Sequence, residues 1–460
     1  MSSEKGHQFF KKLEETFLPG EGGMRGKRIL LIALFVIVAG LIGLHFAAPF
    51  RFVDFPVYYH AGLSLLKGRT DIYAADFALS PLLDYRYPPL FLVLFSPLSL
   101  LPHSVAAYVW FWTCVLEIVA CVWLVRRIIG QALNQNENAK FNWTSRILAL
   151  LIVGQYFIIA LKYGNAHLLV TALLFGSFYL LMRRKDGWAA LLMSLAVTIK
   201  LIPLIALPYF ALKRRWLFLS LTAVFLIALN LAPALYFGFD KNLELMRTWY
   251  ETIVLDHESH EKDSWINLSL KGQLRRYLTE IDYSTRAIGT DNFDREYEQV
   301  NLISISQDAS NRIWAVASFF IFTFSLLLIW FRARRDGNNG ISPANAEHGE
   351  RLLIEFSLII CLLLIIGPLT PKIYFIKLLL PAACLAAVIF NPARPAGKFY
   401  RRALLLIAGA NLILPLLPGR LTQRYLLVLG TDFYLTLALM LVAVSLLFAG
   451  NRQGQTHRES

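Results

Sequence analysis

The chain has 460 residues, of which 57% are hydrophobic and only 17% are charged, and its formal net charge at pH 7 is +14. A soluble protein carries about a quarter charged residues, so this composition excludes an ordinary soluble enzyme. Apolar runs long enough to cross a bilayer recur from end to end, and we therefore expect an all-α polytopic membrane protein.

The first 28 residues are polar, and no small-residue cleavage site follows the first apolar run. We therefore expect a cytoplasmic tail at 1–28 and a retained membrane helix, not a signal peptide, at 29–46. About twelve membrane helices are predicted, at 29–46, 105–125, 147–160, 166–182, 188–200, 201–212, 216–237, 312–331, 352–369, 373–391, 403–418 and 425–449.

Prolines at 88, 89 and 102 bound the run 88–101, which we interpret as a short re-entrant helix. The predicted organisation is one transmembrane catalytic domain over 29–449, with outer loops at 47–87 and 238–311, followed by a cytoplasmic tail at 450–460. The longer loop carries charges of both signs and predicts a small folded insertion with short helices.

Basic residues cluster in four short loops of this topology: Arg126-Arg127, Arg183 to Lys185, Lys213 to Arg215, and Arg332 to Arg335. With the N-terminus inside, all four loops are cytoplasmic, as the positive-inside rule requires. We interpret them as orientation anchors, so the net charge does not indicate a nucleic-acid partner. The sequence predicts an inner (cytoplasmic) membrane protein whose unusual polar residues emerge on the extracytoplasmic side.

Cysteine and histidine spacing predicts no metal site, because the sequence contains no CxxC or HExxH pattern. A divalent cation remains open as a cofactor, since Asp71, Asp76 and Asp84 lie on one outer loop. A solvated loop face is the favoured interpretation of these three carboxylates.

Asp54 lies where the first apolar run ends, within the stretch Phe52-Val53-Asp54-Phe55. An ionisable group at the edge of a bilayer is costly to desolvate and is a functional candidate for that reason. We expect its carboxylate to act as a general base on an attacking hydroxyl. The alternative is a helix cap or an ion pair with Arg51.

Polar residues recur at the outer ends of later apolar runs. Lys162 and Asn165 fall in one polar turn, and an asparagine amide can donate and accept hydrogen bonds to a sugar. A lysine in an apolar stretch either snorkels or meets an anion, here a lipid phosphate. The expected substrate-binding residues are Tyr58, Arg86, Tyr87, Lys162, Asn165, Lys200, Trp265, Asn267, Lys372 and Arg420.

Several of these strings together resemble glycosyltransferase family 87, a family of GT-C integral-membrane enzymes. The resemblance rests on Asp54-Phe55 with Tyr58-Tyr59, on 87–91 (YPPLF), on Gly164-Asn165, on 200–203 (KLIP), and on Asn267 with Ser269-Leu270. It extends from about residue 29 to 449 and implies a GT-C bundle with its active site in the extracytoplasmic loops.

The resemblance also implies a chemistry. A polyprenyl-phosphate-linked sugar, either a mannose-like hexose or a pentose, would be the donor, and an envelope glycan or glycolipid the acceptor. Transfer would invert the anomeric carbon, with Asp54 in the position of the family's base. A transporter or flippase of a lipid-linked sugar is the alternative, because it would share the hydropathy and the outer polar residues.

Overall fold

The computed structural model describes residues 52–74, 77, 84–133, 143–255, 266–280, 300–337, 339–391 and 396–449. Within these ranges the secondary structure is helical and no strand is present. The helix predicted at 29–46, both predicted tails, Arg51, Asp76 and Trp265 lie outside the described residues.

Seven described helices are long and apolar enough to cross a membrane: His103–Ala132, Thr144–Tyr163, Trp216–Phe237, Gln307–Arg335, Lys372–Ile389, Lys398–Leu416 and Thr431–Phe448. The all-α membrane class is thereby supported, whereas the predicted number of twelve helices is not confirmed. Four shorter apolar helices accompany the seven, at Pro89–Leu100, His167–Met182, Asp186–Ile199 and Ile202–Leu212.

Individual elements follow the predicted runs in the first half of the bundle, except that the helix predicted at 105–125 continues to Ala132, so Arg126-Arg127 lie within a helix and not in the predicted loop. The helices are α5 (His103–Ala132), α6 (Trp143–Tyr163), α7 (His167–Met182), α8 (Asp186–Ile199) and α10 (Trp216–Leu231). The run 201–212 differs, because it opens as a 3-10 turn, η3 (Ile202–Ala206), before α9 (Leu207–Leu212). Pro203 sits in the first turn of η3, where a missing amide proton costs little.

The second half contains α15 (Gln307–Arg335), α16 (Ala346–Ile365), η5 (Lys372–Leu378), α17 (Leu379–Ile389) and α18 (Lys398–Ile413). The run 425–449 is not one helix: it divides at Gly430 into α19 (Arg420–Leu429) and α20 (Thr431–Ala449). Gly430 has a φ of +72°, in the left-handed region that favours glycine, and it ends α19.

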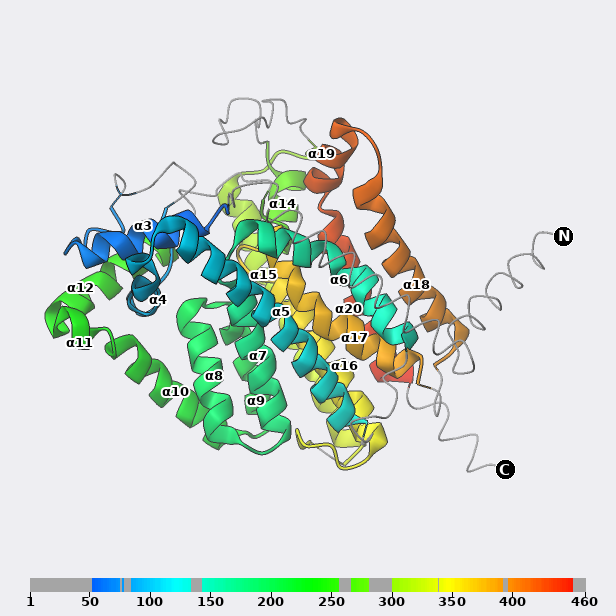
Figure 1. Ribbon diagram of the computed structural model, residues 1–460. Helices are drawn as coiled ribbons and strands as arrows, with labels where there is room; N and C mark the ends of the chain where they lie inside the picture. Colours follow the sequence, from blue (N-terminus) through cyan, green and yellow to red (C-terminus); the bar gives the residue numbers. More distant parts are fainter. Residues whose placement is uncertain are drawn as a thin grey trace, which may run out of the picture.

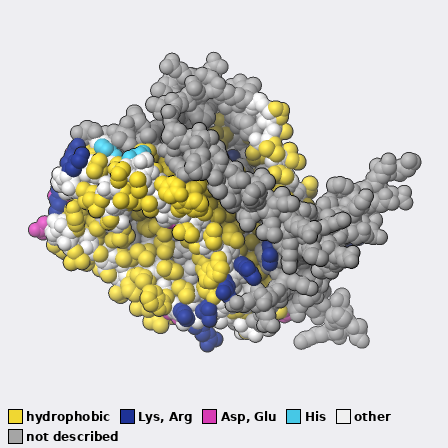
Figure 2. Space-filling model, viewed as in Figure 1, with side chains coloured by type: hydrophobic (Ala, Val, Ile, Leu, Met, Phe, Trp, Pro, Cys, Tyr) yellow, Lys and Arg dark blue, Asp and Glu magenta, His cyan; other side chains and the backbone are white. Residues whose placement is uncertain are grey.

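The centre of the bundle is formed by α16 and α17, whose side chains are buried along nearly their whole length. In contrast, α10 and α15 expose large apolar side chains such as Val224, Phe320 and Phe324. Exposed leucine and phenylalanine on a long helix are expected where lipid replaces water. Figure 2 shows the resulting apolar face, with Lys and Arg side chains gathered along its lower edge.

One end of the bundle collects the basic loops. Arg184 bonds Ser342, Lys213 forms a buried ion pair with Glu355 at 2.6 Å, and Asp336 pairs with Arg351 at 2.5 Å. The first contact joins the loops after α7 and α15, and the other two join the loops after α9 and α15 to α16. The described basic loops after these three helices therefore share one end, as the predicted topology requires.

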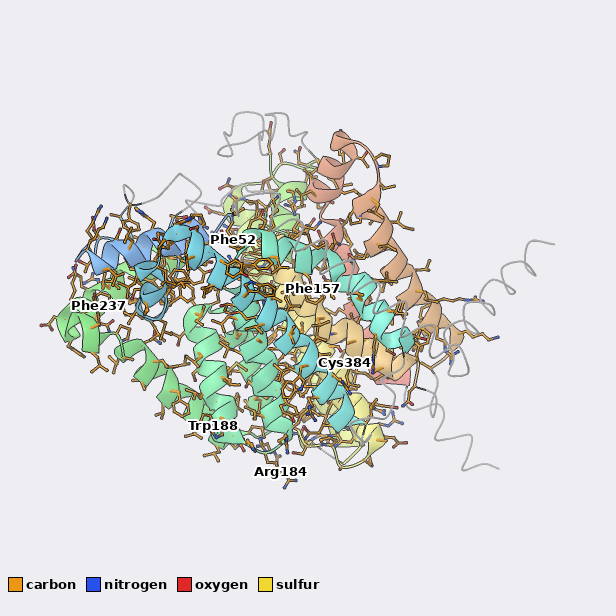
Figure 3. The ribbon with its side chains drawn as sticks, in the orientation of Figure 1. Phe52, Phe157, Arg184, Trp188, Phe237 and Cys384 are labelled. Atoms are coloured by element: carbon orange, nitrogen blue, oxygen red, sulfur yellow. The ribbon has the colours of Figure 1, made fainter. Side chains whose placement is uncertain are left out.

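The opposite end carries Asp54 and the helix that follows it, α3 (Phe55–Leu66). Figure 1 shows α3 lying across the end of the bundle, above α7 and α8, and not along its axis. The labelled side chains Phe52 and Arg184 mark the two ends in Figure 3. Since α7 spans 16 residues, the two ends are separated by about 24 Å of helix.

The two predicted outer segments contain short helices where they are described. After α3, the chain returns as α4 (Pro89–Phe95) and η2 (Ser96–Leu100), which match the short helix expected at 88–101. The longer loop follows α11 (Ala234–Phe237) and contains α12 (Phe239–Trp249), a π-helical turn at Tyr250–Leu255, and α14 (Leu270–Leu278).

Candidate functional site

The Asp54 backbone is fixed against the turn that joins α6 to α7. Its amide donates to the carbonyl of Tyr163 at 2.9 Å. The turn itself depends on Gly164, whose φ is +60° and whose missing Cβ leaves room for the Phe52 ring. Trp110 on α5 donates through Nε1 to the Gly164 carbonyl at 2.7 Å, so three segments meet behind the carboxylate.

A chain of hydrogen bonds begins at the Asp54 carboxylate. Asn165 donates from Nδ2 to Asp54 Oδ2 at 2.6 Å, and Asn165 Oδ1 accepts from the Tyr87 hydroxyl at 3.2 Å. The Tyr87 hydroxyl lies 2.7 Å from that of Tyr58. Asn165 Oδ1 also accepts from the amide of His167, which fixes the orientation of the amide group. Four of the predicted residues are thus brought together.

Burial raises the pKa of Asp54 above its ordinary value. The hydrogen bond from Asn165 and the positive charges of Lys200 and Arg86 oppose that rise. Asp54 as a whole residue remains partly exposed to solvent. A carboxylate with increased proton affinity that can still be reached from outside is suited to accept a proton from a bound hydroxyl.

Lys200 approaches the same group from the end of α8. Its ammonium lies 4.7 Å from the centre of the Tyr87 ring and donates to the Tyr374 hydroxyl at 3.2 Å. The extended backbone at Lys200 ends α8 and turns the chain into η3. A cation and a carboxylate therefore share one end of the bundle, with Tyr87 and Asn165 between them.

Three residues next to this group were not among the predicted site residues. Tyr374 and Lys377 lie one 3-10 turn apart on η5, and Lys377 Nζ, fully buried, is 3.1 Å from Nδ1 of His167. The His167 and Tyr374 rings are in contact, with centroids 3.4 Å apart. The sequence does contain a signal for these residues, since Tyr374 and Lys377 are three positions apart just before an apolar run. Their side chains share one face only if the segment is a 3-10 helix, and no 3-10 helix was predicted there.

Of the remaining predicted residues, Arg86 and Asn267 are held by partners outside this hydrogen-bond chain. Arg86 donates to Asp84 at 2.7 Å, and Lys162 is exposed at the end of α6. Asn267 bonds backbone groups of Pro368 and Thr370, at 2.9 and 3.1 Å, and so fastens the loop before α14 to the segment before η5. Arg420 begins α19, but its side chain lies outside the described part.

Lys372 is paired with a carboxylate that the sequence had not singled out, Asp432, at 3.6 Å. Two of the three acidic residues considered for a cation are held by arginines: Asp71 by Arg69 at 2.6 Å, and Asp84 by Arg86. Among the described residues, no group of three His, Cys, Asp or Glu side chains is arranged to hold a metal ion.

Comparison with known proteins agrees with this architecture. The model of glycosyltransferase family 87 matches residues 85–345, which is more than half of the chain. The chain belongs to glycosyltransferase family 87. The matched segment of this family-87 protein includes Tyr87, Asn165 and Lys200, whereas Asp54 precedes it.

A relative from Mycolicibacterium smegmatis (strain ATCC 700084 / mc(2)155) is 31% identical over 183 residues. It is a polyprenol-phosphate-mannose-dependent alpha-(1-2)-phosphatidylinositol pentamannoside mannosyltransferase. The alignment covers 39% of this family-87 protein and 42% of the relative, so the chain spans less than half of the relative's length. No solved structure matches the chain.

Proposed function

We propose that this membrane glycosyltransferase moves a sugar from a polyprenyl-phosphate donor to a glycan or glycolipid acceptor, with inversion at the anomeric carbon. Membership of family 87 supports sugar transfer, and the mannose-dependent relative supports a lipid-linked donor of the mannose type. The observation that carries the proposal is that Tyr87 joins the two charges: its hydroxyl bonds Asn165, which holds the Asp54 carboxylate, and its ring lies under the Lys200 ammonium.

In the proposed reaction, the acceptor hydroxyl loses its proton to Asp54 as its oxygen bonds to the anomeric carbon. The bond between that carbon and the phosphate oxygen breaks, and its electron pair leaves with the polyprenyl phosphate. Positive charge develops on the sugar ring and negative charge on the departing oxygen. Lys200 would stabilise the latter, because a fixed ammonium in a partly desolvated site interacts strongly with developing charge.

The neighbouring groups are proposed to position the reactants. Asn165 holds Asp54 by one charge-assisted hydrogen bond, which leaves the other carboxylate oxygen available to the acceptor. Tyr374 holds Lys200 by accepting a hydrogen bond from its ammonium through the hydroxyl. Tyr58 and Tyr87 form the buried wall behind the site, and Arg86 adds a second positive charge that acts on Asp54.

Placement of the site outside the cytoplasm is part of the proposal. The basic loops after α7, α9 and α15 gather at the end opposite Asp54, and basic loops are retained on the cytoplasmic side of bilayers. A donor whose isoprenoid chain lies among the helices would then present its sugar at the outer surface.

Reconstitution tests the proposal. Purified protein in lipid vesicles is given a polyprenyl-phosphate mannose and, separately, a polyprenyl-phosphate arabinofuranose, with octyl α-mannoside as acceptor. We expect release of polyprenyl phosphate together with a new glycoside of inverted configuration. Movement of intact donor between leaflets without any new glycosidic bond would refute transfer and support the transporter alternative.

A further inference from the structure

A second polar centre lies at the same end of the bundle as Asp54, between α6, α18 and α20. Its carboxylate, Asp432, is only 2% exposed. Oδ1 of Asp432 accepts from the Tyr156 hydroxyl at 2.6 Å, whereas Oδ2 has no hydrogen-bond partner. The ammonium of Lys372 lies 3.6 Å from Oδ2, beyond hydrogen-bond distance. A buried carboxylate oxygen is costly to leave unbonded, which points to a missing ligand.

The groups around Asp432 are otherwise satisfied. Asn411 on α18 accepts through Oδ1 from Gln155 at 2.9 Å, and the same oxygen lies 3.2 Å from the Tyr156 hydroxyl. Asn411 also donates to the carbonyl of Ile152. These contacts hold Asp432 Oδ1 in place and leave Oδ2 facing Lys372, whose side chain is about one-third exposed. Asp432 Oδ2 is thus buried behind Lys372, and a ligand would reach it from the side of this cation, which is the part of the centre that solvent reaches.

This centre is connected directly to the Asp54 site. Lys372 and Tyr374 are two residues apart on η5, and a 3-10 helix rises about 2 Å per residue. Tyr156 precedes Tyr163, which binds the Asp54 amide, by seven residues of α6, or about 10 Å along that helix. The two centres are thus near enough to contact different parts of one head group.

We propose that Lys372 and Asp432 form a binding site for neighbouring hydroxyl groups of the acceptor, on a sugar ring or a comparable polyol. The inference rests on the proposed function and names the chemistry by which the same enzyme recognises its acceptor. One hydroxyl donates to Asp432 Oδ2, and a second, on the adjacent carbon, accepts from the Lys372 ammonium. A phosphate fits poorly, because Asp432 would repel it. This assignment replaces the expectation that Lys372 contacts a donor phosphate.

If Asp432 only holds three helices together, loss of its hydrogen bond to Tyr156 matters. If it binds a ligand, loss of its charge matters. Asp432→Asn keeps an oxygen for Tyr156 but removes the charge that receives the acceptor. Tyr156→Phe removes the helix-fastening hydrogen bond and leaves Lys372 and Oδ2 untouched. Asp186→Asn is the matched control, since Asp186 is a half-buried carboxylate paired with Arg215 at the opposite end.

The experiment measures binding and turnover separately, on the full chain in nanodiscs. Octyl α-mannoside binding is followed by saturation-transfer NMR without donor, and KM values for this acceptor and for polyprenyl-phosphate mannose are measured in transfer assays. We expect Asp432→Asn and Lys372→Met each to weaken acceptor binding and raise acceptor KM about tenfold or more, the loss of one hydrogen bond to a charged group. The donor KM changes by less than about twofold, and Asp186→Asn behaves as wild type.

Three results would overturn the inference: no saturable binding of the mannoside to the wild type, wild-type binding by Asp432→Asn, or equal effects of Asp432→Asn and Tyr156→Phe on both substrates. Failure of the proposed function is recognised separately. In that case no sugar is transferred by any variant, while mannoside binding still depends on Asp432.

Discussion

Replacing Asp54 with asparagine tests the proposed base with little disturbance of the fold. Asparagine has the same shape, and its oxygen can still accept the hydrogen bond that Asn165 now donates at 2.6 Å. The carboxamide cannot take up the acceptor proton. Burial already raises the pKa of Asp54, so the ionised carboxylate is less stable in the folded protein than in water. We therefore expect Asp54→Asn to fold with a Tm at or above that of wild type.

The size of the activity loss follows from the single function removed. Loss of one general base reduces turnover by about 10² to 10⁴-fold. This corresponds to roughly 3–6 kcal/mol of transition-state stabilisation, at about 1.4 kcal/mol for each factor of ten. Because Lys200 and the sites for both substrates remain, we expect the loss in kcat and only small changes in either KM.

The assay is sugar transfer from polyprenyl-phosphate mannose to octyl α-mannoside, measured for both proteins across pH. In the wild type, kcat rises with pH through the pKa of Asp54, since only the ionised carboxylate can act as a base; the opposing charges of Lys200 and Arg86 limit how high that pKa lies. In Asp54→Asn this rise disappears. A variant with wild-type kcat, or with the same pH dependence, would refute the reasoning.

Three further substitutions test the remaining parts of the account. Lys200→Met keeps the apolar stem but removes the ammonium, and we expect donor KM to rise about tenfold or more with little change in acceptor KM. Gly164→Ala forces an alanine to φ +60° and puts its Cβ 2.6 Å from Phe52, so chemical denaturation should show a loss of about 2 kcal/mol. Lys213→Met removes the 2.6 Å partner of the fully buried Glu355, which keeps Arg351 at 3.4 Å and the hydrogen bond from Tyr209, so it should destabilise the fold by about 1–3 kcal/mol without shifting either KM.

Matched controls accompany these variants. Lys398→Met removes an exposed lysine and should leave donor KM unchanged. Gly154→Ala adds a Cβ at a helical position with no neighbour within 4 Å, so it should not destabilise. Glu355→Gln added to Lys213→Met should recover part of the lost stability. An unstable Gly154→Ala, or a Lys213 variant as stable as wild type, would contradict the corresponding packing argument.

The convergence of Asp54, Asn165 and Lys200 could be predicted because it depends mainly on topology. Basic loops mark the cytoplasmic end of each apolar run and so give each run a direction. The three polar residues all lie at the opposite ends of their runs, and they must therefore share one end of the bundle. The limits of α7 and α8 follow similarly, since charged or turn-forming residues interrupt each run near the observed ends, whereas α5 continues through Arg126 and Arg127 to Ala132. The roles of these three residues stay a prediction.

Side-chain partners distant in sequence could not be predicted in the same way. Asn267 binds Pro368 and Thr370, and Lys372 meets Asp432, through packing that no local pattern encodes. The break at Gly430 was signalled by the glycine itself, but the apolar residues on either side favoured a continuous helix.

The central claim is most directly tested by a structure of the protein with a non-hydrolysable donor, a polyprenyl phosphonate of mannose. We expect phosphonate oxygens within hydrogen-bond distance of Lys200 Nζ, with the anomeric carbon facing the Asp54 carboxylate. A phosphonate bound among the basic loops near Arg184, or one contacting neither Lys200 nor Tyr374, would contradict it.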